Sequence, residues 1–319
     1  MAKSEKFRYE FSWCETRKGP EQVADRKTNS FPDIGERLRA YRIASNRSVD
    51  DLAKRLGVSR AAVYRYEKGE IVKIETVQRL ARLLHVPMTA LMGIDTEFVA
   101  DGTVFFERIR QIESRAQSTV IVFGPIAYVL TSDEYDVILR RALGETYPEV
   151  TPGVQAKLDV LFDSLAKRKA AYREKRLGIV SISSLPEIER FLAHGLVART
   201  NVSERTSAER RAHAVREVRH IAAMLRRPPM GVQIGLLTEG LPVSGYQIIR
   251  EPDRTRVVNS PFRIVDIPNL RFGVASIIDM DHVVQMHEEM ANELWSSAVT
   301  GVEAARIIET LADEAERRL

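Results

Sequence analysis

The stretch SVDDLAKRLGVSRAAVYRYEKGE runs from Ser48 to Glu70 and holds two short helical patterns separated by Gly57 and Val58. A serine precedes each pattern, at Ser48 and Ser59. Both are expected to cap a helix N-terminus, because a serine hydroxyl can accept a hydrogen bond from a free N–H group there. Gly57 suits the tight turn between the two helices. The second helix has little apolar surface of its own, so its arginine and tyrosine side chains are expected to contact another molecule.

Helical patterns continue on both sides of this stretch. Apolar residues recur at helical spacing from Ile34 to Met92, which favours five short helices around one core. The positions expected to face inward include Ile34, Leu38, Tyr41, Leu52, Leu56, Val58, Ala62, Val63, Tyr66, Val77, Leu80, Ala81, Leu84, Leu91 and Met92. Lys68 and Gly69 end the third helix. We therefore predict an all-α five-helix domain over residues 32–95.

Within this block, the pattern LAKRLGVSRAAVYRYEKGE resembles the lambda-repressor-like helix-turn-helix domain of the xenobiotic-response-element family of transcriptional regulators. The resemblance covers residues 33 to about 93, less than a fifth of the chain. The matching positions are Leu52-Ala53, Gly57-Val58-Ser59, Val63, Tyr66-Glu67 and Gly69. Many members of the family carry Gln where this chain has Val49, which weakens one phosphate contact and leaves the fold assignment intact. The resemblance implies a DNA-binding domain whose third helix lies in the major groove.

In such domains the N-terminal part of the third helix contacts base edges. Arg60 can pair with O6 and N7 of guanine, and Ala61 can meet a thymine methyl group. Tyr64 can reach a base edge or a phosphate, while Arg65 and Lys68 are better placed for the DNA backbone. The predicted DNA-binding residues are Ser48, Ser59, Arg60, Ala61, Tyr64, Arg65 and Lys68. The alternative is a solvated charged face on a helical bundle.

Charge is concentrated in the same block. The whole chain has a net charge of +4, and residues 33–95 contain 12 Lys and Arg against 8 Asp and Glu, again a net of +4. The other regions together are therefore balanced. A local excess of positive charge is what binding to phosphates requires.

Length and composition limit the class of protein. A chain of 319 residues is long enough for two domains. The single cysteine, Cys14, excludes an internal disulfide framework and a cysteine-rich zinc site. No apolar run approaches the roughly 18 residues that a membrane span needs, and the N-terminus lacks the apolar core of a signal peptide. These features predict a cytoplasmic protein.

Residues 1–31 read as an N-terminal arm and connector. Phe7, Tyr9, Phe11 and Trp13 alternate with polar residues, which is the period of a strand. A single strand is not stable alone, so it would have to join a sheet edge in its own chain or in a partner. A disordered arm with a few aromatic residues is the alternative.

Residues 96–319 alternate between strand-like and helical segments, then show several strand-like runs and two terminal helices. This order predicts an α/β domain with a mixed sheet. The runs VQIGLLTEGLP and NSPFRI resemble the uncharacterised domain that follows such headpieces in many bacterial regulators. In the leading hypothesis, residues 96–319 form a sensory and dimerisation domain.

A small-molecule effector site is expected in loops between these strands, since loops carry ligand contacts more often than strands do. The candidate effector-binding residues are Glu239, Tyr246, Arg250 and Arg263. The terminal helices offer apolar residues for either dimer packing or the core, namely Val283, Met286, Met290, Leu294, Ile307, Ile308 and Leu311.

A basic helix over Glu209–Arg227 has three interpretations: a second DNA contact, an arginine clamp for an anionic effector, or an exposed surface. Its six arginines are Arg210, Arg211, Arg216, Arg219, Arg226 and Arg227. His213 and His220 share one face of this helix. They are expected to be structural, because no third ligand type lies nearby.

The sequence contains no H-E-x-x-H zinc motif and no glycine-rich phosphate-binding motif. We therefore predict no catalysis, no cofactor and no metal. The leading hypothesis is a homodimeric transcriptional regulator that binds a double-stranded, pseudo-palindromic operator and an unknown small-molecule effector. The alternatives are an enzyme fused to a DNA-binding headpiece, and a DNA-binding antitoxin or adaptor whose C-terminal domain binds a partner protein. The sign of regulation stays open.

Overall fold

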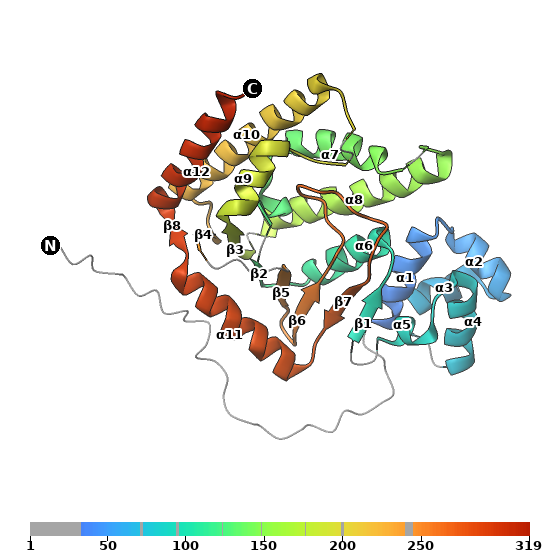
Figure 1. Cartoon of the computed structure of the whole chain (residues 1–319). Helices are drawn as coiled ribbons and strands as arrows, with labels where there is room; N and C mark the ends of the chain where they lie inside the picture. The colour runs from blue at the N-terminus through green and yellow to red at the C-terminus, as the bar shows by residue number, and fades with distance from the viewer. Residues whose placement is uncertain are drawn as a thin grey trace, which may run out of the picture. The chain divides into compact units, whose positions relative to one another are not determined.

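The structure is a computed structural model that describes residues 33–70, 73–93, 96–122, 124–147, 149–175, 177–198, 201–239 and 245–319. The aromatic alternation from Phe7 to Trp13, and Cys14, lie outside the described residues. The described residues belong to one compact unit. We call residues 33–93 the headpiece and residues 96–319 the body, as in Figure 1, where the headpiece runs from blue to teal. The boundary at residue 95, taken from the sequence, stays a prediction.

The headpiece contains the five predicted helices. They are α1 (Ile34–Ala44), α2 (Val49–Leu56), α3 (Arg60–Glu67), α4 (Ile74–Leu84) and α5 (Met88–Met92). Leu38, Leu52 and Leu80 are fully buried in their shared core. Ser48 and Ser59 accept hydrogen bonds from backbone N–H groups of the first turns of α2 and α3, at 3.0 and 3.2 Å. Local caps and apolar spacing therefore define these helices, as the sequence predicts.

The body is built on a mixed sheet. Its strands are β1 (Thr96–Val99), β2 (Ser118–Val122), β3 (Gly178–Ser184), β4 (Val232–Leu237), β5 (Tyr246–Arg250), β6 (Thr255–Asn259), β7 (Ala275–Ile278) and β8 (Val299–Thr300). Among the described residues they form one 8-stranded sheet in the order β1-β7-β6-β5-β2-β3-β4-β8. The central strands β2, β3 and β4 are parallel, and the other neighbours are antiparallel. The prediction of a mixed sheet is confirmed.

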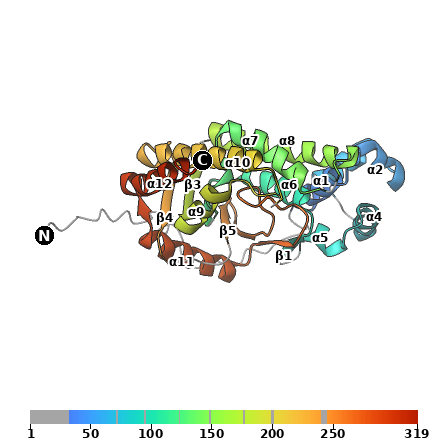
Figure 2. The ribbon, with the colours of Figure 1, turned by 45° about the horizontal axis from the view of Figure 1, so that its top comes forward.

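Helices cover both faces of this sheet. They are α6 (Gly102–Glu113), α7 (Asp133–Glu145), α8 (Pro152–Lys175), α9 (Leu185–His194), α10 (Glu204–Arg226), α11 (Asp281–Ser297) and α12 (Gly301–Glu316), with a short 3-10 turn, η2, at Tyr128–Leu130. Figure 2 shows α8 and α10 on one side of the sheet and α11 on the other. Side chains alternate across a strand, so Ile249 of β5 joins the large core while Ile248 joins a smaller one beneath α11.

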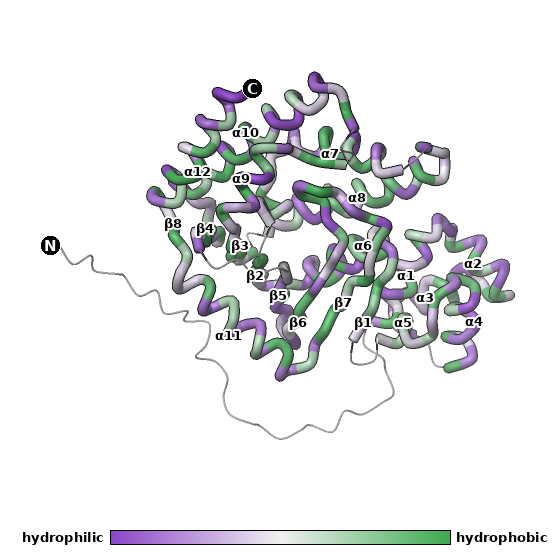
Figure 3. The backbone as a smooth tube through the Cα atoms, in the orientation of Figure 1, coloured by the Kyte–Doolittle hydropathy of each residue, from purple (hydrophilic) through white to green (hydrophobic). Residues whose placement is uncertain are grey.

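The helices alternate between hydrophilic and hydrophobic segments along their length (Figure 3). This is the pattern of helices with one apolar stripe against a core. Within the part of the chain that the structure describes, no helix is long and apolar enough to cross a membrane. The terminal helices α11 and α12 lie where the sequence predicts them.

Several elements differ from the sequence prediction. Strand β1 was not predicted, because four residues are too few to show a strand period. Helix α10 begins earlier than predicted, since the Ser203 hydroxyl caps it by accepting from Thr206 N at 3.2 Å. The sequence predicts a strand-like run over RVVNSPFRIVDI, residues 256–267, but β6 ends at Asn259, just before Pro261, which has no N–H to donate to a sheet.

Candidate nucleic-acid interface

Helix α3 separates its residues into an inner and an outer side. Ala62 and Val63 are buried against the headpiece core. Arg60, Ala61 and Tyr64 lie exposed on the outer side, and 48% of the Tyr64 surface is accessible. This outer side lies in the N-terminal half of the helix, which is the part that reaches base edges in helix-turn-helix complexes.

The contacts of Arg60 leave it available to a ligand. Its Nε lies 2.8 Å from an Asp50 carboxylate oxygen, and both side chains are more than half exposed. An exposed pair of this kind contributes only about 0.2–1 kcal/mol. A guanine edge or a phosphate can therefore replace Asp50 at small cost.

The remaining predicted DNA-binding residues surround this face. Arg65 and Lys68 are exposed towards the C-terminal end of α3. Ser48 and Ser59 are exposed and accept N-capping hydrogen bonds. Their hydroxyls can still donate to a phosphate, since a capping hydroxyl uses only its acceptor side.

Three residues that the sequence reasoning missed hold α2 and α3 in place. Arg42 of α1 bonds both oxygens of Glu67 at 2.5 and 3.2 Å, and both side chains are mostly buried. Gly35 of α1 lies under the end of α3, where an added Cβ would come within 2.4 Å of Gly69 N. Arg79 of α4 donates to the Leu56 carbonyl at the end of α2, at 2.5 Å. These contacts are long-range and leave no local pattern in the sequence.

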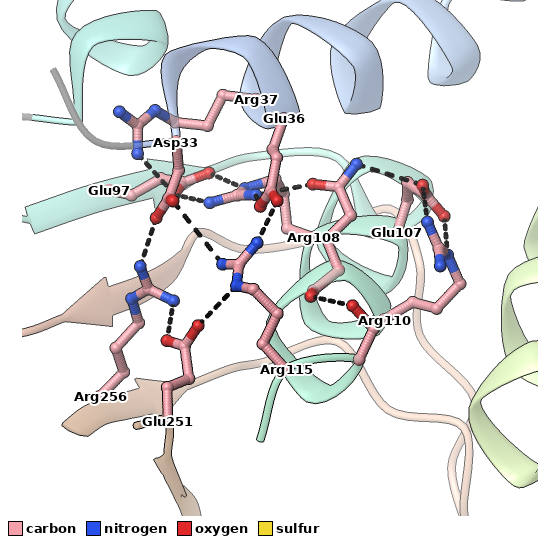
Figure 4. A network of polar contacts seen from close by, with 12 residues as sticks. Asp33, Glu36, Arg37, Glu97, Glu107, Arg108, Arg110, Arg115, Glu251 and Arg256 are labelled. Carbon is pink, nitrogen blue, oxygen red and sulfur yellow. Dashed lines mark hydrogen bonds and ion pairs between the residues drawn. The ribbon is translucent and has the colours of Figure 1, made fainter. Parts of the chain in front are cut away.

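A network of charged side chains, buried at its centre, joins the headpiece to the body (Figure 4). Asp33, the residue before α1, pairs with Arg256 of β6. Glu36 of α1 pairs with Arg115, which follows α6, and lies 3.4 Å from Arg108 Nη1. Burial alone would raise the pKa of Asp33, but the surrounding arginines, Arg256 foremost, hold it below its usual value of 3.8.

Arg108 of α6 lies at the centre of this network. Its guanidinium donates to both oxygens of Glu97 on β1, at 2.7 and 2.9 Å, and to Gln111 at 2.6 Å. Arg37 of α1 approaches the same Glu97 at 3.6 Å and donates to the carbonyls of Leu91 and Met92, both at 2.7 Å. Arg37, Glu97 and Arg108 are all buried. A buried charge is stable only when it is paired. The buried charges of the headpiece are therefore neutralised by charges of the body, and those of the body by charges of the headpiece.

The four candidate effector residues do not converge. Tyr246 and Arg263 line a cavity of about 580 Å³ in the body. The Tyr246 hydroxyl, however, donates to the His287 carbonyl of α11 at 3.2 Å. Arg250 pairs with Glu288 of α11, and Glu239 is exposed just beyond β4.

The basic helix α10 uses its arginines mainly within the chain. The ion pairs are Arg210 with Glu145, Arg211 with Glu204, Arg216 with Glu134, Arg219 with Asp313 and Glu316, and Arg226 with Glu309. This arrangement favours the interpretation of α10 as a surface helix bound to its neighbours. His213 is buried 3.6 Å from Glu217, and burial lowers its pKa. In the described ranges, no group of three His, Cys, Asp or Glu side chains could hold a metal ion.

The residues considered for dimer packing divide between the two terminal helices. Ile308 of α12 is buried in the large core, with Ile307 and Leu311 packed beside it. On α11, Val283 and Leu294 are partly buried, whereas Met286 and Met290 are exposed. Among the residues considered for dimer packing, the exposed ones therefore lie on α11.

Comparison with known proteins agrees with the headpiece geometry. Residues 33–91 match the protein family described as a helix-turn-helix domain. Residues 33–91 form a helix-turn-helix domain. A protein of Pyrococcus furiosus, provisionally named an HTH-type transcriptional regulatory protein, is 47% identical to this chain over 61 residues. The chain covers 19% of that relative's length, so the similarity concerns a short segment. In the helix-turn-helix domain, α2 and α3 are the two helices of the motif and Gly57, with a φ of 70°, makes the turn.

Proposed function

We propose that the chain is a sequence-specific DNA-binding transcriptional regulator. The observation that carries the proposal is the outer side of α3. Arg60, Ala61 and Tyr64 are exposed there together, while the opposite side of the helix packs against the headpiece core. The Arg42–Glu67 pair holds the end of that helix against α1. The name of the Pyrococcus furiosus relative supports the same role.

We further propose that the regulator is a homodimer that binds an inverted repeat in double-stranded DNA. A single helix-turn-helix domain covers only one half-site, so recognition of a whole operator requires two copies. The exposed Met286 and Met290 on α11 support this helix as the contact between copies. An effector bound in the body would change DNA affinity, and the cavity lined by Tyr246 and Arg263 supports such binding. Catalysis and cofactors form no part of the proposal.

The proposal is tested by selecting genomic DNA fragments with the purified full chain at physiological salt. The expected result is a discrete inverted repeat. Arg60→Ala should then lose discrimination at one base pair per half-site, at a cost of about 1–3 kcal/mol. Arg205→Ala is the matched control, because Arg205 is a highly exposed arginine on α10 of the body. Binding that is sensitive to salt but blind to sequence would refute the proposal.

A further inference from the structure

The body contains a cavity of about 580 Å³ at the carboxyl end of β2. Ligands in α/β proteins bind preferentially at the carboxyl ends of parallel strands, and this volume falls within the range of small-molecule sites. Aromatic side chains form much of the wall, namely Phe105 and Phe106 of α6, Tyr128 of η2, and Phe262. Such walls suit a flat aromatic molecule, because aromatic rings stack on or meet each other edge to face.

The charged side chains of the wall are neutralised by their neighbours. Arg168 of α8 is buried and bonds both oxygens of Glu113, at 2.6 and 2.8 Å. A second group joins two arginines to two carboxylates, namely Arg190, Arg263, Glu187 and Asp266. A charged ligand would therefore leave water without gaining a counter-charge, which is costly. The wall favours an uncharged ligand.

Gln247 of β5 supplies this wall with a hydrogen-bond acceptor. Its Nε2 donates to a Glu113 oxygen and to the Thr119 hydroxyl, both at 2.9 Å. An ionised carboxylate only accepts hydrogen bonds, so the contact with Glu113 fixes which end of the amide is nitrogen. The amide oxygen Oε1 has no hydrogen bond to any residue that the structure describes, and the side chain is half-buried. A ligand with an O–H or N–H group can supply the missing donor.

We propose that this cavity binds an uncharged, flat aromatic molecule with a phenolic hydroxyl, its rings among the phenylalanines and its O–H donated to Gln247 Oε1. A phenolic hydroxyl lies in the plane of its ring and has a pKa of about 10, so it is a neutral donor at pH 7. The proposal specifies the effector class of the regulator and rests on the proposed function only for its effect on DNA binding.

Helix α6 connects this site to the headpiece. Phe105, Phe106 and Ile109 face the cavity, while Arg108 bonds Glu97 and lies against Glu36 of α1. A second connection runs through β6, where Val258 lines the cavity and Arg256 pairs with Asp33. A ligand that displaces α6 or β6 must therefore alter the buried charges that position the headpiece.

The ligand class is tested by calorimetric titration of the full chain at pH 7 without DNA. The probes are 2-naphthol, its methyl ether 2-methoxynaphthalene, which has no proton to donate, and the charged 2-naphthoate. We expect saturable binding of 2-naphthol. The ether should bind about fivefold more weakly, because one hydrogen bond is lost, and 2-naphthoate about tenfold more weakly or worse, because its charge gains no free partner. Equal binding of 2-naphthol and its ether, binding of 2-naphthoate as tight as that of 2-naphthol, or no binding to the folded wild-type chain would each overturn the ligand assignment.

Gln247→Met removes the acceptor and keeps a side chain of similar length. This variant should bind 2-naphthol and its ether with equal affinity, and a preference for 2-naphthol that persists would overturn the role of Oε1. Gln233→Met is the matched control, because Gln233 is an exposed glutamine of β4 outside the cavity wall; it should keep the preference. The comparison of the three probes on the wild-type chain needs no variant, so it decides the ligand class even if Gln247→Met does not fold.

The connection through α6 is tested by amide hydrogen exchange with and without 2-naphthol. We expect altered exchange in both α6 and α1. Altered exchange confined to the cavity wall would overturn the connection. Both experiments omit DNA, so their failure is distinct from failure of the regulator proposal, which the selection of DNA fragments decides.

Discussion

Arg108→Met removes the central cation of the network between headpiece and body and largely keeps the volume of the side chain. Glu97 would then stay buried, with 5% of its side chain exposed, and would keep only the Arg37 contact at 3.6 Å. Breaking a buried ion pair by removing one partner costs about 3–5 kcal/mol, because the remaining charge is desolvated without compensation. We expect a loss of that size in the free energy of unfolding.

The double variant Arg108→Met with Glu97→Met removes both charges together. Arg37 still donates to the carbonyls of Leu91 and Met92, so the double variant should be at least as stable as the Arg108→Met single variant. The four free energies are measured by urea unfolding followed by circular dichroism at pH 7, and the coupling energy is taken from the mutant cycle. The reasoning is refuted if Arg108→Met costs less than about 1 kcal/mol, the range of a surface pair, or if the two single costs add.

Three further outcomes follow from the headpiece. In the folded state the surrounding arginines hold the pKa of Asp33 below 3.8. Its ionised form therefore stabilises the fold above about pH 4, and this contribution is lost as the pH falls through the folded-state pKa. The difference in the free energy of unfolding between wild type and Asp33→Asn should shrink between pH 7 and pH 3, and a difference that grows in acid would contradict the assignment. Gly35→Ala should destabilise the headpiece by about 1–3 kcal/mol, because the added Cβ would clash with the backbone of Gly69. Gly144→Ala is the control: the atom nearest to its added Cβ lies 3.9 Å away, so thermal unfolding should show no loss of stability. Ser59→Ala should cost about 0.5–2 kcal/mol through loss of the α3 cap, and unchanged hydrogen exchange in α3 would argue against that role.

The headpiece was predictable from sequence because its signals are local. Ser48, Gly57 and Ser59 act within three residues of their own positions, and apolar spacing marks the buried sides of the helices. The exposed face of α3 follows from the same periodicity. The sequence therefore predicts which residues of α3 are exposed, while their contact with DNA stays a prediction.

The body was predictable in its elements and not in its contacts. Asp33 and Arg256, which pair in the structure, are 223 positions apart in the chain. A local sequence pattern cannot indicate a contact between residues so far apart. The arginines of α10 illustrate the same limit. A run of basic residues in sequence gives no sign of the carboxylates of α12 that face Arg219 and Arg226 in the fold. Likewise, spacing along the chain could not show that Arg250 faces α11 while Arg263 lines the cavity.

Helix α6 shows what a sequence pattern can conceal. The segment TVFFERIRQIE, residues 103–113, has apolar and charged residues at helical spacing. In the structure, nearly the whole helix is buried, including Glu107, Arg108 and Gln111. A polar helix face can be buried only if complementary charges meet it, and Glu36 and Glu97 supply them. The position of the headpiece on the body is therefore encoded in matched charges on segments far apart in the chain.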